Sequence, residues 1–193
     1  MALSSKISKG TVLILLAQLF AIAAIAQVKY SAKDNLKILV SGTSTLHDWT
    51  MATAKGDCSA TFTVNGAGQL TDLTALHLSI PVESLKSEKT AMDKNAYKAL
   101  KASKFSAITY TLNSATVTAD GKVKCQGSLS IAGTAVATEL LATAKVNADK
   151  SISISGSKKI SMKEYKVDPP SFMMGTIKTG NDITVKFDLV LKK

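Results

Sequence analysis

The sequence predicts an all-β protein, an extended antiparallel up-and-down β-barrel of about eight strands with one short capping α-helix. Apolar and polar residues alternate along most of the chain, which places one face of each strand in an apolar interior and the other in water. Short polar turns separate the alternating runs, so neighbouring strands must run antiparallel. One segment shows helical spacing instead.

The first residues predict an export signal that precedes the barrel. Two lysines are followed by an apolar run that ends in Ala24-Ile25-Ala26, and these are the parts of a secretory signal peptide. The run is almost long enough to be a retained anchor across a bilayer core of roughly 30 Å, but Gln18 interrupts it and no basic cluster follows it. We expect residues 1–26 to be cleaved off near Ala26, and residues 27–193 to form one periplasmic or secreted domain.

The alternating runs are the expected strands, and turn residues separate them. The runs span residues 36–40, 58–64, 76–82, 108–112, 123–131, 140–146, 152–156 and 183–191. Asn65-Gly66 and Asp120-Gly121 favour tight hairpins, since both pairs tolerate positive φ. Residues 147–150 and 179–182 are polar and predict further turns.

Two segments interrupt the strand pattern. Residues 87–104 are rich in Ala and Lys, and Met92, Ala96, Ala99 and Leu100 recur at helical spacing, which predicts an amphipathic helix over one end of the barrel. Residues 168–175 predict a stiff loop with an apolar triplet that lines or covers an opening.

The barrel interior can be interpreted in two ways from the strand residues alone. Several inward positions are small, namely Ala60, Gly127, Ala142, Ala144 and Gly156. Small residues leave room for a ligand inside a barrel of about eight strands, but they also fit the taper of a packed barrel. These positions do not decide between a hollow and a packed interior.

The charge of the chain argues against nucleic-acid binding. The formal net charge is +10, and every basic residue is lysine. Planar arginine side chains are the usual means of specific phosphate and base recognition, and the chain has none. The lysines are expected to keep the protein soluble or to favour transient contact with an anionic membrane surface.

The segment GTSTLHDWT at residues 42–50 resembles the early signature of the YceI-like family. The resemblance continues through IPVESLK at residues 80–86 and MDKNAYKALK at residues 92–101. It then covers FSAITY at 105–110, GSLSIAG at 127–133, and Pro169-Pro170 with Gly175 and the closing strand. In this order it spans essentially all of the mature chain.

The resemblance implies a hollow, lipocalin-like barrel that holds a polyisoprenoid, an isoprenoid quinone or another long-chain amphiphile, for transport or storage. Members of the family are often paired, so a homodimer is expected; no metal and no cofactor other than the bound lipid is expected. The tunnel lining is predicted to include Phe62, Leu78, Ile80, Tyr110, Leu129, Ile131 and Phe187. The rim is predicted to include His47, Trp49, Tyr97, Phe105, Phe172, Met173 and Met174.

Some residue roles stay open. His47 could bind a polar head group, but it could equally help Asp48 and Trp49 to close a barrel end, and we favour this structural role. Cys58 and Cys125 share the inward register, so they form a disulfide if their strands are neighbours and are otherwise small buried residues.

Two other functions are alternatives to lipid binding. A packed barrel could serve as an envelope or stress protein that acts through a protein partner. A hydrolase using His47 is disfavoured because the chain has no G-x-S-x-G motif and two histidines in all. The spacing of His, Cys and acidic residues fits no metal motif, so we expect a binding protein and not an enzyme.

Overall fold

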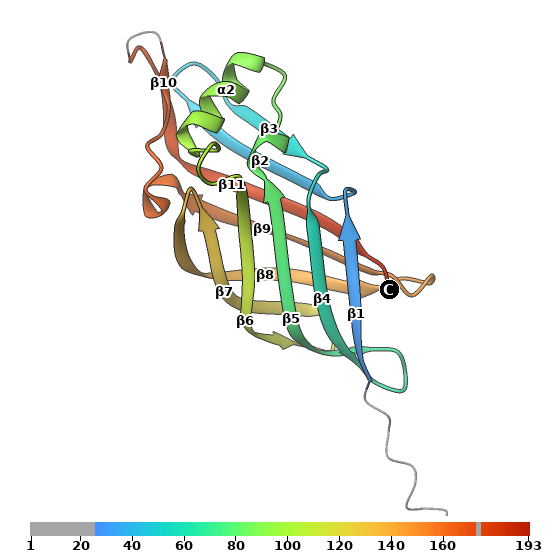
Figure 1. Ribbon diagram of the computed structural model, residues 1–193. Coiled ribbons are helices and arrows are strands. Elements are labelled where there is room, and N and C mark those ends of the chain that lie inside the picture. The colour runs from blue at the N-terminus through green and yellow to red at the C-terminus, as the bar shows by residue number, and fades with distance from the viewer. Residues whose placement is uncertain (1–25, 173–174) are drawn as a thin grey trace, which may run out of the picture.

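The computed structural model describes residues 26–172 and 175–193, and it confirms an all-β, lipocalin-like barrel with one capping helix (Figure 1). The strands are β1 (Ala26–Lys33), β2 (Lys37–Ser44), β3 (Trp49–Thr53), β4 (Asp57–Val64), β5 (Leu70–Pro81), β6 (Ala107–Val117), β7 (Lys122–Ile131), β8 (Thr134–Val146), β9 (Ile152–Ser161), β10 (Ser171–Phe172) and β11 (Ile177–Leu191). The helices are η1 (Val82–Ser84), α2 (Thr90–Ala99) and η2 (Met162–Tyr165).

The sheet curls into a barrel, and β11 contacts a strand of each sheet edge at a different height along the barrel axis. The strand order is β1-β4-β5-β6-β7-β8-β9-β11-β2-β3, and β10 pairs with β11 outside this path. Strands β4 to β9 form the expected antiparallel meander. β11 then pairs with β2, whereas Lys192 just beyond its end pairs with Ser31 of β1. β1 therefore closes one end of the barrel, and β2 and β3 extend the other.

The described residues form eleven strands instead of the predicted eight or so. Each of the eight alternating runs became a strand, and β1, β3 and β10 are additional. β1 and β2 come from one stretch that bends at Asp34, while β3 and β4 come from a second stretch that bends at Gly56. The bends are joined: the Asp34 amide donates to the Gly56 carbonyl at 2.9 Å, and the Gly56 amide donates to the Asp34 carboxylate at 3.2 Å. The hydrogen bond from Gly56 lowers the pKa of Asp34.

Two turn predictions were wrong. Asn65-Gly66 is not a two-residue hairpin, because the Asn65 side chain accepts hydrogen bonds from the amides of Ala67 and Gln69 and so holds a longer loop. Residues 179–182 do not end a strand; they lie within β11, where the pairing with β2 shifts register between Thr179 and Ile183. Polar residues can therefore mark a bulge inside a strand as well as a turn.

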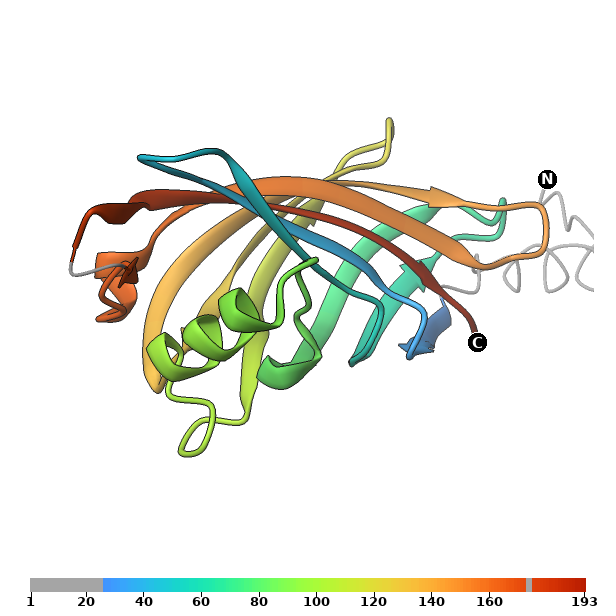
Figure 2. The same ribbon diagram turned by 90° about the horizontal axis from the view of Figure 1, so that it is seen from above.

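The capping helix is shorter than the predicted span of 87–104. α2 ends at Ala99 because Lys101 adopts a left-handed conformation, with φ of 53°, and the Ala102 amide then donates back to the Tyr97 carbonyl. Figure 2 shows α2 lying beneath the arch of the curled sheet. Within residues 26–172 and 175–193, no helix has the length and hydrophobicity needed to cross a membrane.

Candidate ligand-binding cavity

A cavity of about 410 Å³ lies between α2 and the barrel strands that face it. Its walls come from β2, β3, β5 to β9, η2 and β11, and its roof is α2. The wall side chains are mostly aliphatic, aromatic or methionine. Pockets for small organic ligands occupy roughly 300–1,000 Å³ and are mainly apolar, so the size and the composition of this cavity suit an apolar ligand.

Two aromatic rings form the floor of the cavity, and each ring lies against an inward glycine. A Cβ atom added to Gly127 would lie 2.5 Å from the hydroxyl oxygen of Tyr110, and one added to Gly156 would overlap the ring of Phe187. The glycines predicted to leave the barrel empty therefore make space for rings. Tyr110 and Phe187 both border the cavity, so they separate it from the core below.

Below this floor the barrel is packed. Phe62, Ile152 and Leu191 are fully buried there, and Phe62 meets Tyr30 edge-to-face with ring centroids 6.1 Å apart. The packed and hollow interpretations of the interior are thus each correct for one part of the barrel. Phe62 was predicted to line the tunnel, but it belongs to the packed part and does not border the cavity.

The remaining six residues predicted for the tunnel lining all border the cavity. They are Leu78, Ile80, Tyr110, Leu129, Ile131 and Phe187. Three of them form one row across the floor, because Tyr110 pairs with Leu78 on one side and with Leu129 on the other.

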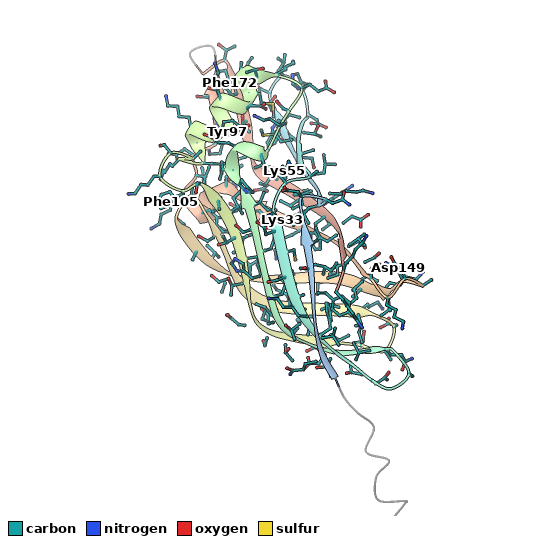
Figure 3. The ribbon with its side chains drawn as sticks, turned by 45° about the vertical axis from the view of Figure 1, so that its right-hand side comes forward. Lys33, Lys55, Tyr97, Phe105, Asp149 and Phe172 are labelled. Atoms are coloured by element: carbon teal, nitrogen blue, oxygen red, sulfur yellow. The ribbon has the colours of Figure 1, made fainter. Side chains whose placement is uncertain are left out.

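The residues predicted for the rim divide into three groups. His47, Trp49 and Phe172 border the cavity. Met173 and Met174 lie outside the described residues. Tyr97 and Phe105 lie elsewhere, on the sides of α2 and of the following loop (Figure 3).

Tyr97 and Phe105 do not border the cavity, and each has a structural partner that the sequence does not reveal. The Tyr97 hydroxyl donates to backbone carbonyls at η1, 2.7 Å from that of Leu85 just after this helix and 2.9 Å from that of Glu83 within it. The ring of Phe105 covers Gly133, whose φ is +80° and whose missing side chain makes room for it.

The β2–β3 turn holds His47 and Trp49 at the mouth through local hydrogen bonds. The Ser44 hydroxyl accepts from the amides of Leu46 and His47, and the His47 ring lies 2.7 Å from the Asp48 carbonyl. The indole N–H of Trp49 donates to the Thr43 carbonyl at 3.0 Å, and its ring covers Gly42 on the paired strand. These contacts favour the structural interpretation of this motif, and they leave Leu46 65% exposed at the edge of the cavity.

A buried hydroxyl cluster, which the sequence pattern does not reveal, completes the wall beside η2. The Tyr110 hydroxyl donates to the Thr138 carbonyl at 3.4 Å, and the hydroxyls of Thr138 and Tyr165 lie 3.1 Å apart. Burial raises the pKa of both phenols, so they stay neutral at physiological pH. Tyr165 could not be predicted from the sequence, because it lies in a short 3-10 helix whose apolar residues show no regular spacing.

The described residues of the cavity wall include no carboxylate. The charged side chains of the wall are Lys89 and Lys158, and His47 lies in the same wall. In the same part of the chain, no three His, Cys, Asp or Glu side chains gather as a metal site. Cys58 and Cys125 are free and buried, β5 and β6 separate their strands, and burial raises the pKa of Cys58 to about 12. Since their strands are not neighbours, the two cysteines form no disulfide in this structure and are small buried residues, the second of the two alternatives.

One buried carboxylate ties the roof helix to the segment that precedes it. Asp93, which is 6% exposed, accepts hydrogen bonds at 2.7 Å from both the amide and the hydroxyl of Ser87, and the Lys86 ammonium lies 4.0 Å away. Burial opposes the ionised form, but the Ser87 hydrogen bonds and Lys86 outweigh it and lower the pKa of Asp93.

This anchor predicts that the cap is sensitive to acid. The Asp93→Asn variant should lose about 1–3 kcal/mol of stability at neutral pH, because charged hydrogen bonds are lost. Since the pKa is lowered in the folded state, the stabilisation is present above the ordinary value of 3.8 and disappears as pH falls through the folded value. Urea unfolding at pH 7 and at about pH 3 should show the two proteins converging in acid. Glu88→Gln, which removes an exposed carboxylate just before α2, is the control. A loss of stability in Asp93→Asn that is the same at both pH values would contradict the assignment.

Comparison with known proteins places this fold. Burkholderia cenocepacia BcnA is similar with a TM-score of 0.65 and 15% identity, over 82% of this chain and 96% of that one. A polyisoprenoid binding domain from Saccharophagus degradans, implicated in plant cell wall breakdown, is similar with a TM-score of 0.61 and 14% identity, over 86% and 99%. A Campylobacter jejuni YCEI protein is similar with a TM-score of 0.56 and 21% identity, over 70% of this chain and 81% of that one.

Among curated proteins, none matches the sequence closely. The family model described as the YceI-like domain matches residues 20–191, which is nearly the whole chain. The chain therefore belongs to the YceI-like family.

Proposed function

We propose that the protein is exported and holds one long-chain apolar lipid in the cavity beneath α2, for transport or storage. The observation that carries this proposal is the apolar cavity of about 410 Å³, closed below by Tyr110 and Phe187. Each CH₂ group buried in such a cavity contributes roughly 0.8 kcal/mol. An apolar tail therefore gains affinity along its whole length without any specific polar contact.

The ligand class follows from the wall and from the family. The fold of the Saccharophagus degradans domain, which is named for polyisoprenoid binding, supports an isoprenoid chain, an isoprenoid quinone or a fatty-acid-like amphiphile as the ligand. Methionines at the wall, Met51, Met92 and Met162, suit irregular apolar chains because their side chains adapt in shape.

Binding without catalysis fits the chemistry of the wall. A hydrolase would need a base and a nucleophile in contact, but His47 is the one histidine that borders the cavity and its ring contacts the Asp48 carbonyl. His77, the other histidine, lies on the outer face beside Thr111. The proposal therefore assigns His47 to the mouth and to no reaction.

Native mass spectrometry of the protein purified from its own cell envelope tests the proposal. We expect an amino terminus at or near Gln27, and a bound mass that solvent extraction identifies as one long-chain lipid. A bare protein mass that stays unchanged after incubation with octaprenyl or quinone lipids would overturn the lipid-binding proposal. An uncleaved amino terminus would overturn the export proposal, and the native mass also reports whether two copies pair.

A further inference from the structure

The α2 segment carries a concentration of exposed positive charge, most of which lies outside the cavity. Residues 86–104 contain six lysines, and all six are exposed: Lys86, Lys89, Lys94, Lys98, Lys101 and Lys104. The same segment contains Glu88 and Asp93, of which Asp93 is buried. The outer surface of the cap is therefore strongly basic.

Three of these lysines form what we call the lysine stripe: Lys94, Lys98 and Lys101. Lys94 and Lys98 lie one turn apart on α2, and Lys101 follows in the turn just after its end. Within the described residues none of the three forms an ion pair. Elsewhere lysines do have carboxylate partners, as Lys122 has Asp120 at 2.8 Å. The stripe presents uncompensated charge to the surroundings.

The lysine stripe does not serve the bound ligand. The roof of the cavity is formed by other α2 side chains, including Met92, Ala96 and Ala99, whereas no residue of the stripe borders the cavity. An anion attracted by the stripe must therefore lie outside the barrel.

Exposed apolar side chains lie at the same end of the molecule. Leu46 is 65% exposed at the β2–β3 turn and borders the cavity, and Phe172 of β10 borders it from the neighbouring strand pair. In Figure 1 the β2–β3 turn, β10 and α2 share one end of the barrel, far from the β8–β9 turn. A single exposed leucine is unremarkable by itself, but this one lies at the mouth of an apolar cavity beside a basic helix.

We propose that the α2 end of the protein docks onto an anionic phospholipid surface, with the lysine stripe against the head groups and Leu46 inserted between them. This inference rests on the proposed function, because a lipid carrier must meet a membrane to load or unload. Each lysine near an anionic surface strengthens binding about fivefold. Docking in this orientation brings the cavity mouth to the bilayer.

Vesicle co-sedimentation tests the proposal, with vesicles of equimolar phosphatidylglycerol and phosphatidylcholine compared with pure phosphatidylcholine. The test variant reverses the stripe: Lys94→Glu, Lys98→Glu, Lys101→Glu. The matched control reverses three exposed lysines of the opposite end: Lys29→Glu, Lys145→Glu, Lys192→Glu. All variants are expressed as the full chain, so they share one amino terminus and the same overall charge change.

We expect the wild type and the control to bind anionic vesicles, and the stripe variant to bind at least about a hundredfold more weakly, because three contributions are lost. Leu46→Gln should weaken binding severalfold without changing its salt dependence. An equal loss of affinity for anionic vesicles in the stripe variant and in the control would overturn the proposal. An absence of vesicle binding by the wild type at low salt would overturn it as well. Native mass spectrometry of the same preparations separates the two proposals, since lipid retained by a stripe variant that no longer docks leaves the binding function intact.

Discussion

The double substitution Leu78→Trp with Leu129→Trp is expected to weaken lipid binding severely in a protein that still folds. Both residues flank Tyr110 in the row that crosses the cavity floor. Two indole rings would therefore occupy the space directly above the floor. Excluding about four methylene groups of a lipid removes roughly 3 kcal/mol, which weakens binding about a hundredfold.

Binding should be measured by native mass spectrometry and by displacement of a fluorescent fatty-acid analogue. The matched control is His77→Trp with Thr111→Trp, since this pair lies beside the same row, on β5 and β6, but faces outward and is exposed. The control should retain its lipid. Undiminished binding in a folded Leu78→Trp, Leu129→Trp protein would show that the lipid lies elsewhere, and the cavity would lose its assigned role.

The fold was largely predictable because strand alternation is a local property. Each alternating run became a strand, and Met92, Ala96, Ala99 and Leu100 of the predicted helix all face the cavity. What the alternation could not show was where one stretch of chain bends to serve two parts of the sheet. The paired bends at Asp34 and Gly56 depend on hydrogen bonds between segments distant in sequence.

The candidate site could be predicted where its residues lie on alternating strands. It could not be predicted where a side chain depends on a contact with a residue distant in the sequence. Ile80 and Ile131 could be placed because their inward register follows from period two. The depth of the cavity could not be predicted, because it is set by rings of Tyr110 and Phe187 lying across glycines of neighbouring strands. Phe62 has the same inward register as these residues, but it lies below that floor.

The division of the barrel into a packed part and a hollow part predicts a second large effect. Phe62→Ala should destabilise the protein by about 3–5 kcal/mol, since it leaves a large empty volume in a close-packed core. Phe62 is 0% exposed and packs against the ring of Tyr30. Lipid binding should persist under conditions in which the variant remains folded, because Phe62 does not border the cavity.

Phe187→Ala is the matched comparison, because the same substitution there enlarges a cavity that already exists. Phe187 is only partly buried and borders the cavity, so its removal should cost less stability than that of Phe62 but should alter lipid binding. Urea unfolding of both variants in lipid-free form measures the first effect, since bound lipid would stabilise the folded state by mass action. Equal destabilisation of the two variants, with lipid binding lost in both, would mean that the aromatic floor does not separate a binding chamber from a structural core.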